Sequence, residues 1–198
     1  MEDAVDRLLG QWRHERPDVD VSPMGVVGRI SRASSLLDKS IGRTLAKHDV
    51  QPGEFDVLAT LRRSGSPYRM TAGELLSSTM VTSGAITHRL NRLVTKGLVD
   101  REPDPKDRRS VIVSLTPHGR AIVDRALPDH VENERRMLEV LAPDERGELA
   151  RLLQKLLVGL GDAREEPAEA TLTFTATIPP YRSPSGPMSP SADEELPL

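Results

Sequence analysis

The chain has 198 residues, of which 37% are hydrophobic, 29% charged and 3% aromatic, and this indicates one domain with an aliphatic core plus appendages. It contains no cysteine, which excludes disulfides, thiolate catalysis and cysteine-based peroxide sensing. The net charge of −3 argues at first against a nucleic-acid partner, and no apolar run approaches the roughly 20 residues of a membrane helix.

The first fifty residues predict two helices. In the first, over 3–15, the spacing i, i+3, i+4, i+7 is occupied by Val5, Leu8, Leu9 and Trp12. Ser22 is then expected to cap a long helix with Pro23 at its first position, ending near His48. The acidic start of the chain lacks the apolar segment of a signal peptide, so we expect a cytoplasmic protein.

A helix-turn-helix is predicted further along the chain, after a helix that begins at Pro52 and carries Phe55 and Leu58. Thr71 is expected to cap the first of its two short helices. Thr82 or Ser83 is expected to cap the second, which runs to Lys96, and Gly97 provides a left-handed C-cap.

A change of period follows this pair of helices. Residues 98–101 and 111–115 read as strands, and the polar loop between them contains two prolines. Together these segments predict a β-hairpin with a long basic tip, the shape of a wing. We therefore expect a winged helix-turn-helix between Thr71 and Leu115.

The rest of the chain predicts two more helices and a tail. Thr116 caps a helix that is expected to bend at Pro128 and continue to about Val140. Pro143 opens the last helix, whose stripe is formed by Leu149, Leu152, Leu153, Leu156, Leu157 and Leu160. Residues 163–198 hold little to bury, and their Pro, Ser, Thr and Glu content predicts disorder.

Positive charge gathers around the predicted helix-turn-helix. The tail carries six acidic and two basic residues, a net of −4, so residues 1–162 carry +1 of the total −3. Residues 87–109 hold seven basic and four acidic residues, a net of +3. Phosphate contacts supply most of the affinity of DNA-binding proteins, so this segment suits duplex DNA despite the acidic average.

The second short helix has the two faces of a recognition helix. Ile86, Leu90, Leu93 and Val94 are expected to face inward. Its polar face would reach base edges or phosphates through Ser83, Thr87, His88 and Arg92, with Asn91 beside them. The wing adds Lys106, Arg108 and Arg109, one arginine of which would enter the minor groove. An ordinary surface helix with a solvated charged face remains the alternative for this helix taken alone.

Three segments carry a resemblance to a known family. The string from Thr79 to Arg101 resembles the recognition helix and first wing strand of the MarR family. Residues 105–110, with an aspartate-x-arginine motif at Asp107 and Arg109, resemble its wing, and residues 115–120 resemble the start of its next helix. The resemblance covers about residues 3–160. It implies a mainly α fold with a small β-hairpin wing, that is, a winged helix-turn-helix within a helical homodimer scaffold.

The resemblance also implies which segments of the chain dimerise and which bind DNA. Residues 1–50 and 116–162 would supply dimerisation helices, 51–115 the DNA-binding region and 163–198 a disordered tail. The apolar stripes on the second and last helices support a homodimer independently, because they exceed what the small winged module can cover. Packing of the same helices within one chain is the alternative.

One branch of the family, the urate-responsive and PecS-like regulators, resembles the sequence further. That branch carries a tryptophan on an extra N-terminal helix, an aspartate on the helix before the helix-turn-helix, and two arginines. The matching residues are Trp12, Asp56, Arg89 and Arg101. The resemblance implies a site for a small anionic effector such as urate, another purine metabolite or a tricarboxylate.

The chemistry of these four residues suits a planar anion. Trp12 would stack on it or donate a hydrogen bond, and arginine offers a planar fork of donors. Asp56, paired with Arg101 in the free protein, would be repelled by the negative charge of the bound anion. Loss of that ion pair would move the DNA-recognition helices. Each residue also has an alternative role. Trp12 would pack in the apolar stripe of its helix, and Asp56 would face solvent. Arg101 would contact a phosphate of the DNA, and Arg89 would pair with a nearby acidic residue.

Other chemistries find no support. The five histidines lack metal-ligand spacing, no phosphate-binding glycine motif occurs, and no nucleophile–histidine–acid arrangement is apparent, so no catalytic residue, metal or cofactor is expected. The sequence therefore predicts a ligand-responsive, nucleoid-associated transcriptional regulator of the repressor type. An architectural DNA-binding protein without an effector is the alternative, and a small enzyme or dimeric scaffold without a DNA role is the third.

Overall fold

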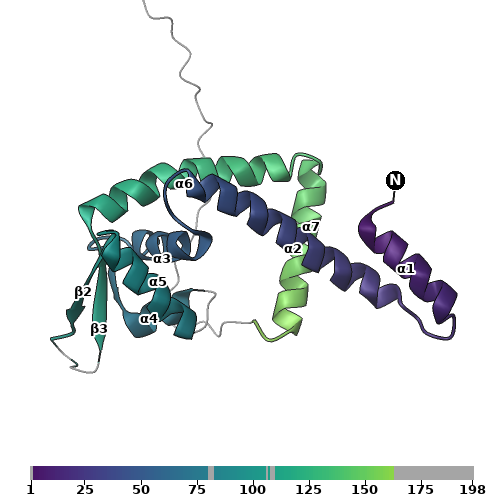
Figure 1. The fold of residues 1–198 in the computed structure, drawn as a ribbon, viewed down its shortest axis with the longest axis horizontal. Helices are drawn as coiled ribbons and strands as arrows, with labels where there is room; N and C mark the ends of the chain where they lie inside the picture. Colours follow the sequence, from purple (N-terminus) through teal and green to yellow (C-terminus); the bar gives the residue numbers. More distant parts are fainter. Residues whose placement is uncertain (1, 80–82, 106, 108–109, 163–198) are drawn as a thin grey trace, which may run out of the picture. The chain divides into compact units, whose positions relative to one another are not determined.

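The computed structural model describes residues 2–79, 83–105, 107 and 110–162. They form a mainly helical protein with one small antiparallel sheet, as the sequence predicts (Figure 1). Clustering of contacts divides the chain into residues 1–150, a compact unit, and residues 151–198. Within the described ranges, none of the helices is both long and apolar enough to cross a membrane.

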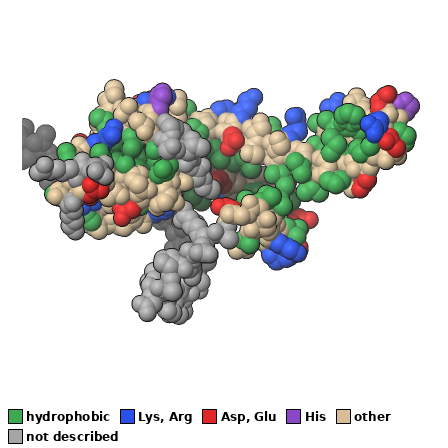
Figure 2. Space-filling view, turned by 90° about the horizontal axis from the view of Figure 1, so that it is seen from below, with side chains coloured by type: hydrophobic (Ala, Val, Ile, Leu, Met, Phe, Trp, Pro, Cys, Tyr) green, Lys and Arg blue, Asp and Glu red, His purple; other side chains and the backbone are tan. Residues whose placement is uncertain are grey.

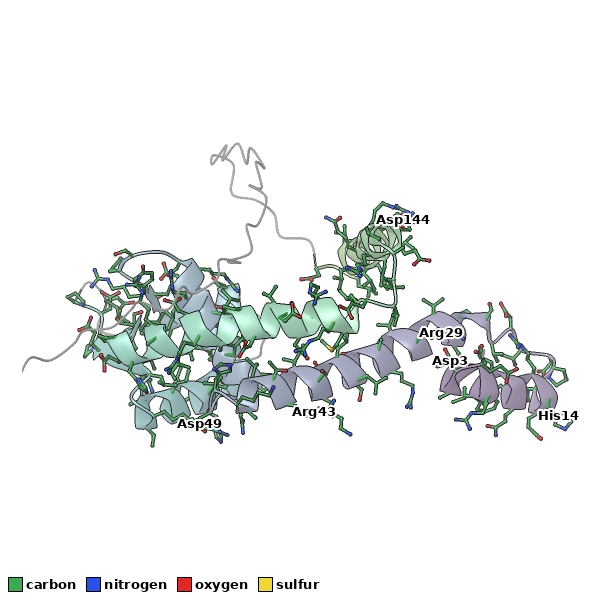
Figure 3. All side chains as sticks on the ribbon, turned by 90° about the horizontal axis from the view of Figure 1, so that it is seen from above. Asp3, His14, Arg29, Arg43, Asp49 and Asp144 are labelled. Carbon is green, nitrogen blue, oxygen red and sulfur yellow. The ribbon has the colours of Figure 1, made fainter. Side chains whose placement is uncertain are left out.

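The two N-terminal helices are joined by ion pairs and a small apolar cluster. Helix α1 (Ala4–Glu15) begins with a capping box in which the Asp3 and Asp6 carboxylates each accept a backbone N–H. Helix α2 (Ser22–Ala46) follows. Arg29 of α2 reaches across to both carboxylates of α1, with Nε 2.8 Å from Asp3 and a terminal nitrogen 2.6 Å from Asp6 (Figure 3).

The start of α2 differs from the prediction. Ser22 is the first residue of the helix rather than its cap. The Asp20 carboxylate accepts hydrogen bonds from the Ser22 backbone N–H at 2.9 Å and from its hydroxyl at 3.0 Å. The N-cap residue is Val21, which makes no side-chain capping bond, so the Asp20 carboxylate supplies the local hydrogen bonds at this helix start.

The main core lies around α3 (Pro52–Arg63), whose apolar side chains are covered by helices and strands on several sides. Its buried members include Leu45, Val57, Leu58, Leu61, Leu75, Leu93, Val113 and Val123. These come from α2, α3, α4, α5, β3 and α6, so α3 packs α4 and α5 against α2 and α6. Helix α3 ends at Arg63, before Gly65, which has a positive φ of 80°.

The predicted hairpin is part of a three-stranded sheet. Strand β1 (Arg69–Thr71) leads into α4 (Ala72–Ser78), and α5 (Ser83–Thr95) leads into β2 (Val99–Pro103) and β3 (Val111–Leu115). The strand order is β1-β3-β2, with β3 in the centre. The prediction lacked β1 because a three-residue strand carries no measurable alternation.

The turns around the sheet match their predicted chemistry. Thr71 caps α4, and Gly97 adopts a φ of 65° after α5. Thr116 caps α6 (Pro117–Met137) by accepting the Gly119 N–H at 2.9 Å. A side chain at Gly119 would overlap the Leu98 carbonyl oxygen, so this glycine allows α6 to approach the start of β2 closely.

The C-terminal part of the described chain is helical. Helix α6 passes through Pro128 and ends at Met137, three residues before the predicted end. Helix α7 (Pro143–Gly159) has no buried residue, and its leucine stripe is exposed. Apolar side chains are also exposed on α1 and α2, including Leu8, Val26, Val27, Ile30 and Leu36. Figure 2 shows hydrophobic side chains on the surface of the same part of the molecule.

Candidate nucleic-acid interface

Helix α5 presents one face to the core and the other to solvent. Ile86, Leu90 and Leu93 are at most 5% exposed and pack into the main core. Val94, predicted to face inward with them, is 42% exposed, so that assignment was wrong. Three buried apolar side chains over two helical turns are enough to hold a helix of this length against the core. Val94 lies at the edge of this apolar stripe.

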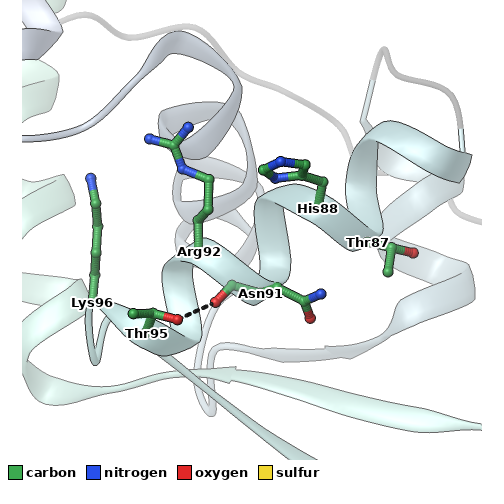
Figure 4. Close-up of a pocket in the computed structure, with 6 residues that line it drawn as sticks. All are labelled: Thr87, His88, Asn91, Arg92, Thr95 and Lys96. Carbon is green, nitrogen blue, oxygen red and sulfur yellow. Dashed lines mark hydrogen bonds between the residues drawn. The ribbon is translucent and has the colours of Figure 1, made fainter.

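The opposite face of α5 is polar and hollowed. Thr87, His88, Asn91, Arg92, Thr95 and Lys96 line an open hollow of about 550 Å³ (Figure 4). In Figure 4, Arg92 and His88 project from one side of the helix and Asn91 and Thr87 from the other. Thr87, His88 and Arg92, predicted to contact DNA, thus all line this hollow, Thr87 from one side and the other two from the opposite side.

Other predicted DNA contacts lie outside the described residues. Helix α5 begins at Ser83, but the structure does not describe the Ser83 side chain, nor does it describe Lys106, Arg108 or Arg109. The base of the wing is described. There the Asp104 N–H donates to the Ser110 carbonyl oxygen at 3.0 Å and closes the hairpin.

A buried carboxylate that the sequence analysis did not single out lies behind α5. Glu54, in the first turn of α3, is 1% exposed. Its Oε2 accepts the Gln51 backbone N–H at 2.9 Å and the Lys96 ammonium at 3.1 Å. Its Oε1 lies 2.9 Å from Arg92 Nε as an ion pair, without the alignment of a hydrogen bond.

The charge of Glu54 is stabilised by these neighbours. Burial raises the pKa of the carboxyl, but the Gln51 N–H, Lys96 and Arg92 together outweigh it and hold the pKa below its ordinary value. The spacing Gln51-x-x-Glu54 signals a capping box in the sequence. Burial of that acid beneath Arg92 of α5 and Lys96, which follows α5, depends on tertiary packing, and the local sequence pattern does not contain this information.

The predicted ion pair between Asp56 and Arg101 does not form. Arg101, on β2, donates instead to the Asn91 side-chain oxygen of α5 at 2.9 Å. The half-buried Asp56 carboxylate has no partner among the described residues. Strand β2 lies against α5, so a neutral amide on α5 takes the place of the expected aspartate.

Arg89, the other arginine of the predicted effector site, lies against the start of α3. Its guanidinium occupies the space that a side chain at Gly53 would need. One terminal nitrogen of Arg89 is buried and has no partner in the described part of the chain. A hollow of about 440 Å³ adjoins it and is lined by Gln51, Pro52, Gly53, Glu54, His88, Arg89 and Arg92.

Trp12 does not join these residues within one chain. It lies on α1, 44% exposed, and α1 packs on α2. The structure thus brings Arg89 beside α3, which carries Asp56, and brings Arg101 to α5, but it leaves Trp12 apart. Among the described residues, no group of three His, Asp or Glu side chains could hold a metal ion.

Comparison with known proteins finds relatives in one family. A family model described as "MarR family" matches residues 48–110. The transcriptional regulator PecS of Dickeya dadantii is 41% identical over 152 residues, which cover 77% of this chain and 92% of PecS.

Solved structures agree with the sequence comparison. A mutant of Escherichia coli MarR complexed with operator DNA has a TM-score of 0.62 and 32% identity, covering 70% of this chain and 96% of that one. Bordetella bronchiseptica BpsR, whose DNA binding is regulated by 6-hydroxynicotinic acid, has a TM-score of 0.61 and 27% identity, covering 67% and 98%.

Proposed function

The chain belongs to the MarR family of transcriptional regulators, and from this premise we propose that it binds a pseudopalindromic operator in duplex DNA as a homodimer. The observation that carries the proposal is the polar, accessible face of α5, which is fixed to the core by its apolar face. A helix held in this way can enter the major groove without losing its own packing.

The exposed apolar surfaces support the homodimer. The isolated chain leaves Val26 at 62%, Val27 at 65% and Leu36 at 58% exposure on α2. Apolar patches of this kind in a water-soluble chain mark interaction sites. In a two-fold dimer, paired recognition helices would meet successive major grooves about one helical turn apart.

We further propose that the protein is a repressor released from DNA by a small anionic effector such as urate, a related purine metabolite or a tricarboxylate. The buried, unpartnered nitrogen of Arg89 and the adjacent hollow support an anion site near α3. Arg101 would leave Asn91 to reach the effector, and this would couple the wing to occupancy of the site.

A mobility-shift experiment tests the DNA-binding role. A duplex from the region upstream of the protein's own gene should be shifted, and Thr87→Ala together with His88→Ala should weaken the complex about 10-fold or more. Arg43→Ala, which removes an exposed arginine of α2 far along the chain from α5, is the matched control. Unchanged binding by the double variant would show that α5 does not face the DNA.

Titration of effectors into this complex separates the proposed repressor from an architectural DNA-binding protein. Urate and citrate should release the wild-type protein, whereas Arg89→Ala should bind DNA but resist release. If neither compound releases the complex at millimolar concentration, urate and citrate are excluded. The alternative, an architectural DNA-binding protein without an effector, then gains support.

A further inference from the structure

We propose that Glu54 is a positioning residue for DNA recognition, which holds Arg92 so that its terminal nitrogens meet one backbone phosphate of the operator. The inference rests on the proposed function, because it requires α5 to enter DNA. Glu54 itself is buried in α3 and would not touch the nucleic acid. Its influence would act through the ion pair with Arg92.

The first step is that Glu54 is a fixed anchor. The carboxylate is tied to its own helix by the Gln51 N–H and to the end of α5 by Lys96. Lys96 is itself held by the Asp49 carbonyl oxygen, 2.5 Å from its ammonium nitrogen. A buried, hydrogen-bonded carboxylate has little freedom to follow a mobile partner, so the partner must adapt to it.

The second step is that Arg92 keeps donors free. Only Nε lies against Glu54, and the terminal nitrogens have no partner among the described residues. The side chain is 40% exposed, and Figure 4 shows these nitrogens pointing away from the helix. An arginine held at Nε presents a planar pair of donors, which matches two oxygens of a phosphate.

The third step favours phosphate over a base. Arg92 is near the C-terminal end of α5, which ends at Thr95. In helix-turn-helix complexes the N-terminal residues of the recognition helix reach the base edges. The end of the helix lies closer to the sugar-phosphate backbone, where a fixed contact sets the register of the protein on its site.

The fourth step concerns charge. One buried carboxylate faces two cations, Arg92 and Lys96, so the cluster keeps a net positive charge. Glu54→Gln raises that charge by one and frees Arg92 to change rotamer. We expect this variant to bind the operator more weakly and to bind an unrelated DNA duplex equally well or more tightly. Nonspecific binding depends on the positive charge of the protein surface and not on the DNA sequence.

The test measures two affinities for the full-length protein. The probes are a duplex of about 30 base pairs, selected from random DNA with the wild-type protein, and its scrambled counterpart. Fluorescence anisotropy at about 50 to 200 mM salt gives the affinity for each duplex, specific and nonspecific. It also gives the slope of log affinity against log salt concentration for each. Glu54→Gln should lower the ratio of specific to unspecific affinity about 10-fold.

Two further variants assign the effect to Arg92. Arg92→Ala should reduce the salt slope by about 1, as expected when one phosphate contact is lost. In the Arg92→Ala background, Glu54→Gln should change the ratio less than about 2-fold, because its route of action is gone. Glu74→Gln is the matched control: Glu74 fills the same capping-box position in α4, is exposed and has no basic partner in the described chain.

Each outcome decides the inference. A Glu54→Gln variant that loses both affinities equally, or whose effect persists in the Arg92→Ala background, shows that Glu54 only stabilises the fold. An effect of Arg92→Ala restricted to one base position overturns the phosphate contact. If the random pool yields no preferred duplex, the proposed function itself fails, whereas a wild-type-like Glu54→Gln overturns this inference alone.

Discussion

At the scale of single residues, Glu54 is a buried charge that links α3 to Arg92 of α5 and to Lys96, beside the apolar core that the two helices share. Removal of one partner of a buried ion pair leaves the other charge desolvated and unpaired, which lowers the free energy of unfolding by several kcal/mol in a protein interior. Arg92 and Lys96 are 40% and 25% exposed, so water compensates them in part. The loss from Glu54→Gln should accordingly be about 2 kcal/mol at neutral pH.

The pH dependence of that loss follows from the lowered pKa of Glu54. The folded state binds the carboxylate's proton less tightly than the unfolded state, so the stabilisation is complete above the ordinary pKa and disappears as pH falls through the folded pKa. Urea unfolding of wild type and Glu54→Gln from pH 7 to about 3 should show two curves that converge at acid pH. Curves separated by a constant distance would contradict a charged Glu54.

At the scale of elements, α1 depends more on burial than on its ion pairs. Val5, Leu9 and Val21 form a small separate cluster, and Leu9 is 4% exposed. Arg29 and its two carboxylate partners on α1 are each more than a third exposed. Exposed ion pairs contribute little to stability because water screens them, whereas truncation of a buried leucine costs about 2–5 kcal/mol.

Leu9→Ala should therefore release α1 while Arg29→Ala leaves it docked. Trp12, the only tryptophan, lies on this helix and reports its environment by fluorescence. Amide exchange in α1 should accelerate strongly in Leu9→Ala and less than about 5-fold in Arg29→Ala at moderate salt. The reverse order would mean that charge, not burial, holds α1.

The same elements show what the sequence could predict. Proline and threonine at helix starts and Gly97 at a helix end set boundaries that the structure confirms within a few residues, because capping is local chemistry. The prediction missed strand β1, placed the cap of α2 at Ser22 instead of Val21 and turned Val94 inward, because tertiary packing decides between the options that the local sequence leaves open. The Arg101–Asn91 bond depends on how β2 lies beside α5, which no local pattern encodes.

At the scale of the whole molecule, the proposed effector residues are divided between distant parts of one chain. Trp12 is on α1, which packs on α2, whereas Arg89 contacts α3, which follows the other end of α2. An α-helix of 25 residues is roughly 37 Å long. A site that uses both residues therefore requires a second copy to bring its α1 to the first copy's α3 and α5.

This geometry predicts complementation between two inactive variants. Trp12→Ala and Arg89→Ala homodimers should each bind DNA and resist release by the effector. In the mixed dimer, one site would combine Trp12 of one chain with Arg89 of the other, and the second site would lack both. Two purified variants with different affinity tags should thus recover about half of the effector sites on mixing, counted by titration of the isolated heterodimer. If each site were built within one chain, both sites of the heterodimer would be damaged, and no response would return. A Trp12→Ala homodimer that responds to the effector like wild type would instead show that Trp12 takes no part in binding.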